Sequence, residues 1–160
     1  PRSVLGHCIH LSEREHDTLA RRRAWIAHCP SSNEALGSGR MDLAAVRRHG
    51  TRYALASDVG AGPSHSMLHV MQRFLAQHRQ AGETVTPQAA LYRATLAGAG
   101  CRGRGDRAGD RTPGKRADFV VWPAPDAGVA TEDWFEELLA GEARDLETRP
   151  LQTWIGGAPA

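Results

Sequence analysis

Three polar side chains stand at or near the ends of short apolar segments, and their types suit hydrolytic metal chemistry. They are His7 in segment 4–9, His28 in segment 24–29 and Asp58 after segment 53–56. Imidazole and carboxylate groups bind zinc, and either group can take a proton from metal-bound water. If the segments are parallel strands, their carboxyl ends meet at one edge, so the three groups converge there. The competing interpretation is that each is a hydrogen-bonded structural residue, the commoner role for a lone His or Asp at a strand end.

The residues alone do not name a reaction. The chain has no H-x-H or H-E-x-x-H pattern, and its other six histidines lack the spacing of metal ligands. Its three cysteines, Cys8, Cys29 and Cys101, form no C-x-x-C pair, so neither a disulfide framework nor a zinc finger is indicated. The Gly60-Ala61-Gly62 turn matches neither phosphate-binding glycine pattern.

Strands and helices are expected to alternate in the first hundred residues. Ser12 and Glu15 fit a capping box that starts a helix running to about residue 23, and Thr86 before Pro87 fits an N-cap with a first-turn proline. Further helices are expected at 41–49 and around 67–75, where apolar residues recur at i, i+3, i+4, i+7 and i+8. Pro30 and the glycines at 37 and 39 predict a loop.

This alternation predicts an α/β fold with a parallel sheet. Three strands cannot close a barrel, and an eight-stranded (β/α) barrel needs about 250 residues. If the fold is such a barrel, the 160 residues hold only three of its units. The chain opens at Pro1 on the approach to a strand, and we interpret that start as a cut.

The second half changes character. Residues 1–99 are expected to form the partial barrel, 100–116 an Arg- and Gly-rich linker, and 117–160 the C-terminal strands of a small β-sandwich. Within the last segment, strands are expected at 117–122 and 153–155, with a short helix at 134–139.

Composition limits the partners. The chain has 20 basic and 18 acidic residues, and the resulting charge of +2 does not favour nucleic acid or an anionic membrane. No apolar run approaches the roughly 20 residues that span a bilayer, and no signal peptide is apparent. A cytoplasmic protein with a small neutral ligand is therefore expected.

Several motifs match one known family in order and spacing. They are Gly6-His7-Cys8-Ile9-His10-Leu11-Ser12, Ile26-Ala27-His28-Cys29-Pro30-Ser31-Ser32-Asn33, Leu36-Gly37-Ser38-Gly39, Ser57-Asp58-Val59-Gly60, Ser66-Met67-Leu68, Ala90-Leu91-Tyr92-Arg93-Ala94-Thr95-Leu96 and Pro113-Gly114-Lys115-Arg116-Ala117-Asp118-Phe119-Val120-Val121. This set resembles guanine deaminases of the metal-dependent amidohydrolase superfamily. The likeness covers the chain to about Trp122 and is weak beyond it.

The resemblance implies a fold and a site. The fold would be the last three units of a TIM-like (β/α)8 barrel with part of a β-sandwich, and the reaction would convert guanine to xanthine and ammonia. Asp58 would be the carboxylate after the eighth strand, which ligates zinc and takes a proton from its water. His7 would be the histidine after the sixth strand, which stabilises the tetrahedral intermediate. His28 and Asn33 would lie near the substrate pocket, and the family commonly forms dimers, which implies a homodimer.

Two departures from the family follow. Its H-x-H, its metal-binding His with a proton-shuttling Glu, and its guanine-binding Arg would all precede Pro1, so we expect the isolated chain to lack deaminase activity. The family's apolar segment before Pro113 is replaced by Arg102, Arg104, Ala108 and Arg111, which are costly to bury unpaired. Two alternatives stay open: a non-catalytic remnant that associates through exposed sheet edges, and an amidohydrolase acting on another amino-heterocycle.

Overall fold

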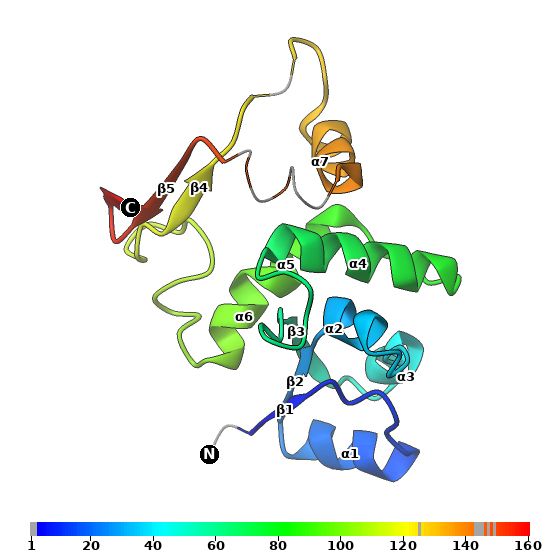
Figure 1. The fold of residues 1–160 in the computed structure, drawn as a ribbon. Coiled ribbons are helices and arrows are strands. Elements are labelled where there is room, and N and C mark those ends of the chain that lie inside the picture. Colours follow the sequence, from blue (N-terminus) through cyan, green and yellow to red (C-terminus); the bar gives the residue numbers. More distant parts are fainter. Residues whose placement is uncertain (1–2, 125, 143–145, 147, 149) are drawn as a thin grey trace.

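A three-stranded parallel sheet organises the first half of the chain (Figure 1). The structure is a computed structural model, and it describes residues 3–124, 126–142, 146, 148 and 150–160. The strands lie in the order β1-β2-β3, and their bounds are β1 Val4–Gly6, β2 Trp25–His28 and β3 Arg52–Leu55. The α/β architecture expected from the alternation is therefore confirmed.

The three strands differ in how deeply they are buried. Leu5 of β1 pairs with Ile26 of β2, and Ile26 pairs with Tyr53 of β3. Ile26 is fully buried and Tyr53 nearly so, whereas Leu5 is 38% exposed. β1 and β3 are the two edge strands of the described sheet, but only β1 is exposed to solvent, and β2 and β3 carry the core.

Helices connect the strands and pack against β3 and one another. Their bounds are α1 Glu13–Arg21, α2 Pro30–Ala35, α3 Leu43–Arg48, α4 Met67–Gln80, α5 Pro87–Ala94 and α6 Leu96–Cys101. Helices α4, α5 and α6 lie against β3, and α1 lies beside α3. On α4, the expected apolar face is buried through Met71, Phe74 and Leu75.

Local capping signals set two helix starts as expected. The backbone N–H of Ser12 donates to Glu15 Oε2 at 2.8 Å, and the Ser12 hydroxyl accepts from the Glu15 N–H, so the capping box is present. Thr86 Oγ1 accepts from the Ala89 N–H at 3.2 Å. The loop expected at Pro30 is wrong, because Pro30 is the first residue of α2, where its missing N–H is no loss.

The Arg- and Gly-rich segment is an ordered surface loop. Helix α6 extends to Cys101, so the loop begins later than residue 100. Gly109 has a φ of 101°, and a Cβ there would lie 2.8 Å from both the Cα of Leu96 and the Cβ of Ala99, so the loop passes close against α6. The arginines at 102, 104, 107 and 111 are exposed, so none of them is buried without a partner.

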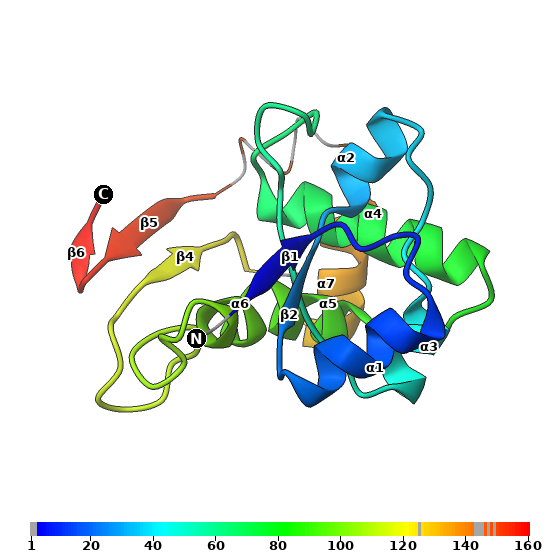
Figure 2. The ribbon, with the colours of Figure 1, turned by 90° about the horizontal axis from the view of Figure 1, so that it is seen from below.

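A second, antiparallel sheet stands to one side of the helical layer (Figures 1 and 2). Its strands are β4 Phe119–Val121, β5 Gln152–Ile155 and β6 Ala158–Pro159, in that order. The rings of Phe119 and Trp154 stack across β4 and β5 with centroids 5.6 Å apart. These strands agree with the small satellite sheet expected for the C-terminal segment.

The helix between these strands packs elsewhere. Helix α7 (Thr131–Ala140) lies against α4 and α5, and its Leu138 and Leu139 are buried. Gln72 Nε2 of α4 donates to the carbonyl of Gly141 at 2.7 Å, and Arg79 of α4 pairs with Glu136. Part of segment 117–160 therefore belongs with the first layer and not with the second sheet.

Candidate active site

His7 and Asp58 lie just beyond the carboxyl ends of β1 and β3. His7 directly follows β1, and Asp58 comes three residues after β3. Both adopt left-handed backbone conformations, with φ of 61° and 52°, and so does Cys8 with 52°. Such conformations cost about 1–3 kcal/mol each in residues other than glycine and concentrate at functional sites. The turns aim both side chains across the same edge of the sheet.

The two side chains approach each other in an open cavity. His7 Nε2 lies 3.8 Å from Asp58 Oδ2, and the side chains are 43% and 31% exposed. The cavity has a volume of about 560 Å³ and is also lined by Ile9, His10, Leu36, Ser38 and Ala61. The two groups are too far apart for a direct hydrogen bond, and both face a cavity in which a small molecule could contact each of them.

His10 is a cavity residue that the sequence argument passed over. Its Nε2 lies 3.1 Å from the carbonyl oxygen of Ser38, which ties the loop after β1 to the loop after α2. The signal that would have found it is its position three residues after His7, on the same loop. Ser38 and His10 thus close one side of the cavity.

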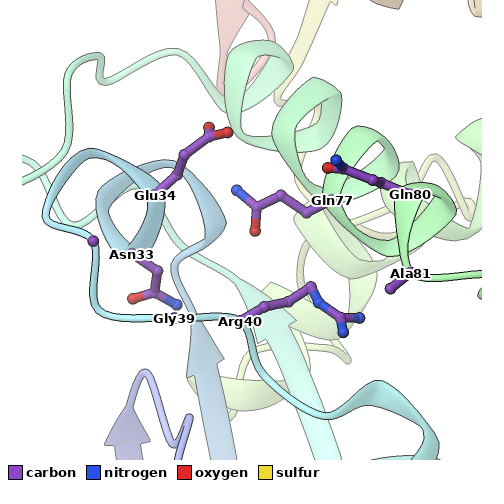
Figure 3. A pocket seen from close by; sticks show the side chains of 8 residues that line it. Asn33, Glu34, Gly39, Arg40, Gln77, Gln80 and Ala81 are labelled. Atoms are coloured by element: carbon purple, nitrogen blue, oxygen red, sulfur yellow. The ribbon is translucent and has the colours of Figure 1, made fainter.

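Asn33 contacts His7 from outside this cavity. Its Oδ1 lies 2.8 Å from His7 Nδ1, and the residue is only 1% exposed. Asn33 lines a second cavity of about 480 Å³, which shares no lining residue with the first (Figure 3). The structure thus places Asn33, expected near a substrate pocket, behind the imidazole of His7.

His28 does not reach the His7 cavity. Its side chain is fully buried, its Nε2 lies 3.1 Å from Nε2 of His78, and its ring meets Phe74 and Tyr53 edge-on. Successive residues of a strand point to opposite faces, and His28 is on the face covered by α4. His28 therefore lines neither of these two cavities, and its place near a substrate pocket stays a prediction.

Burial keeps the histidine pair neutral. Desolvation, with the neighbouring His78, lowers the pKa of His28 to about 3. Desolvation, with Arg40 and Arg47, lowers the pKa of His78 to about 4. One imidazole therefore donates to the other at neutral pH, and the pair serves packing between the sheet and α4.

The thiols are unsuited to act as nucleophiles. Burial raises the pKa of Cys8, Cys29 and Cys101 above the ordinary thiol value, that of Cys29 to about 11. The thiolate is the reactive form, and burial in these surroundings disfavours it. These three cysteines are therefore poor candidates for covalent catalysis.

The donors present do not complete a metal site. No group of three or more His, Cys, Asp or Glu side chains that could hold a metal occurs among the described residues. Catalytic zinc sites use three protein ligands and structural ones four. His7 and Asp58 are a pair, so these side chains fit at most part of a zinc site.

The amidohydrolase family model matches residues 1–155, nearly the whole chain. The chain belongs to the amidohydrolase family. It is 41% identical to a probable guanine deaminase of Deinococcus radiodurans over 98% of this chain and 38% of that protein. The parallel sheet and its helices are thus those of an amidohydrolase.

Solved structures agree with the family assignment. The structure of the Escherichia coli guanine deaminase superposes with a TM-score of 0.87 at 32% identity, over 98% of this chain and 38% of that one. An adenosine deaminase from Xanthomonas campestris with bound zinc superposes with a TM-score of 0.80 at 27% identity, over 98% and 36%. This amidohydrolase chain thus spans less than two fifths of the length of each of these three relatives.

No helix in the described ranges is both long and apolar enough to cross a membrane.

Proposed function

We propose that this chain forms part of a zinc-dependent guanine deaminase, which hydrolyses guanine to xanthine and ammonia in cytoplasmic purine catabolism. The observation that carries the proposal is the approach of His7 Nε2 to Asp58 Oδ2, at 3.8 Å, in a cavity beyond the strand ends. The similarity to proteins named guanine deaminase supports the choice of substrate.

In the proposed reaction, each of the two side chains handles a proton or a developing charge. Water attacks the ring carbon that bears the amino group, a C–O bond forms, and the Asp58 carboxylate takes a water proton. The C–N bond then breaks, and the amino group leaves as ammonia with that proton. His7 faces the attacking water and helps to stabilise the tetrahedral intermediate, whose hydroxyl group can donate a hydrogen bond to Nε2 of the imidazole.

Asp58 is the one zinc ligand that we assign to this chain. A single carboxylate cannot hold a catalytic zinc, so the remaining ligands have to come from outside the described residues. We therefore expect the isolated chain to show no guanine turnover. A complete enzyme would combine Asp58 and His7 with ligands from another segment.

A chimera tests this proposal. Residues 1–155 would replace the matching portion of the Deinococcus radiodurans relative, and guanine-dependent ammonia release and zinc content would be measured. We expect turnover in the chimera, and we expect Asp58→Asn to reduce kcat/KM by about 10²–10⁴-fold, the usual contribution of a positioned acid or base. The asparagine tolerates the left-handed backbone at this position.

Asp106→Asn is the matched control, because the Asp106 side chain is 74% exposed on the surface loop. Equal turnover in the Asp58 and Asp106 variants would contradict the role of Asp58. A folded, zinc-loaded chimera without turnover would instead favour the association-module alternative, for which the sedimentation of the 160-residue chain is the direct measurement.

The likeness to an adenosine deaminase favours a second substrate class, an amino-purine nucleoside. The chimera would be offered adenosine in parallel with guanine. A higher kcat/KM for adenosine would replace guanine in the proposal and keep the roles of His7 and Asp58.

A further inference from the structure

Asn33 is held rigidly in a place where its amide oxygen meets His7. Its backbone N–H donates to the Cys29 carbonyl at 3.0 Å, and its own carbonyl accepts from the Ser38 N–H at 2.9 Å. Helix α2 is fixed in turn by Gln77 Nε2, which donates to the Pro30 carbonyl at 2.9 Å. Asn33 is only 1% exposed, so its side chain has little freedom to turn away from His7.

The hydrogen bond to His7 fixes which ring nitrogen carries the proton. An amide oxygen only accepts hydrogen bonds, so Nδ1 of His7 must be the donor across the 2.8 Å contact. In the neutral ring, Nε2 is then the nitrogen with the free lone pair. That nitrogen is the one that lies 3.8 Å from Asp58 Oδ2.

The nitrogen end of the Asn33 amide is not held by a second hydrogen bond in the described part of the chain. Asn33 Nδ2 has no hydrogen-bond partner among the described residues. In Figure 3 the side chain extends from α2 toward the loop at Gly39 and Arg40. Among the described residues, the Asn33 side chain is thus hydrogen-bonded only through its oxygen, to His7.

We propose that Asn33 is a positioning residue that sets the ring orientation and the tautomer of His7, leaving Nε2 as the acceptor that faces Asp58. The proposal deepens the proposed function and rests on it for its kinetic consequence. The tautomer itself does not depend on that function, because it follows from the contact between Asn33 and His7.

The first experiment reads the tautomer directly. Two-bond ¹H–¹⁵N correlation spectra of the 160-residue chain would be recorded at a pH where His7 is neutral. We expect the proton on Nδ1, with Nε2 showing the shift of an unprotonated nitrogen. A proton on Nε2 in the unmodified chain would overturn the proposal without any variant.

The second experiment uses variants of the same chain and of the chimera. Asn33→Leu removes the acceptor, and we expect the His7 tautomer to change and kcat to fall by about 10- to 100-fold, the effect typical of a lost hydrogen bond to an active-site histidine. KM should change little, because the proposal has Asn33 act through His7 and not on the substrate. Asn33→Asp keeps an acceptor oxygen and should restore the Nδ1 tautomer and part of kcat.

Ser31→Ala is the matched control, since Ser31 is equally buried on α2 and its hydroxyl has no hydrogen-bond partner among the described residues. It should leave the tautomer and kcat unchanged. If Asn33→Leu does not fold, the spectra of the unmodified chain and of Asn33→Asp still show whether the His7 proton is on Nδ1, and so they test the proposal. A rise in KM at constant kcat would overturn the positioning role in favour of substrate binding, whereas a chimera with no activity but an Nδ1 tautomer would contradict only the proposed function.

Discussion

His7 and His28 belong to neighbouring strands, yet they occupy opposite environments. His7 leaves the end of β1 through a left-handed turn and stands half exposed against Asp58. His28 is the last residue of β2 and is sealed between the sheet and α4 against His78. The same side chain is thus kept available for proton transfer in one place and kept neutral in the other, and the difference lies in solvent access and in the partner.

The largest expected contrast comes from substituting each region in turn. Asp58→Asn should change the unfolding free energy of the chain by no more than about 0.5 kcal/mol, because the side chain is partly exposed and near-isosteric. His28→Ala should lower it by about 2–5 kcal/mol, because it opens a cavity in the core. Urea unfolding followed by circular dichroism measures both. Equal losses would show that the two regions are not separated as described.

Acid should act on the core pair. The pKa of His28 is lowered to about 3 and that of His78 to about 4, so the folded chain resists protons that the unfolded chain takes up below about pH 6.5. The contribution of the two histidines to the unfolding free energy should therefore be fully present above about pH 6.5. As the pH is lowered below that value, the unfolding free energy should fall by about 1.4 kcal/mol per pH unit for each histidine that stays neutral in the folded chain. Urea titrations between about pH 7 and about pH 4.5 measure the slope.

The double variant His28→Leu/His78→Leu isolates this slope. Replacing both partners with apolar groups is expected to be close to neutral at pH 7, whereas His78→Leu alone leaves a buried nitrogen unpaired and should cost about 1–3 kcal/mol. The double variant should lose most of the acid dependence. His65→Leu, at an exposed position, should keep it. An unchanged slope in the double variant would assign the acid dependence to other groups.

The smallest expected effect concerns His49, whose side chain is 12% exposed and whose pKa is shifted in the opposite direction to those of His28 and His78. Hydrogen bonds that the His49 ring donates to the carboxylates of Glu13, at 2.7 Å, and Asp17, at 2.8 Å, raise the pKa of His49 above its ordinary value. Its contribution is therefore fully present below the ordinary histidine pKa and is lost as the pH rises through the raised value. His49→Gln should reduce the fall of the melting temperature across that range. A melting temperature that varies with pH as in the unmodified chain would rule out the contribution.

The elements that could be predicted from sequence were those with local causes. The Ser12–Glu15 capping box and the Thr86 cap act over three residues, and the apolar face of α4 repeats within the helix, so their residue types suffice. Helix α2 was missed because Pro30 was interpreted as a loop residue, although proline is also favoured in a first helical turn. Proline at this position is compatible with a loop and with a first helical turn, and only the helical conformation of the residues after it distinguishes the two.

The partners of the site residues needed the tertiary structure. The segment around His28 is apolar throughout, and such a segment carries no alternation to show which face a residue occupies. The contact between His7 and Asn33 joins residues 26 positions apart, and the contact between His28 and His78 joins residues 50 apart. Crossover connections of parallel strands bring such residues together, and spacing along the chain does not report them.

By itself, the sequence determined the kinds of groups this amidohydrolase chain offers and the strand ends where His7 and Asp58 stand, because residue type and local periodicity act over a few residues. Only the tertiary structure decided that His7 faces Asp58, that Asn33 supports His7 from behind, and that His28 is buried with His78. The physical reason is that burial, tautomer and pKa depend on what packs around a group, and packing is set by strand pairing and helix placement across the whole fold.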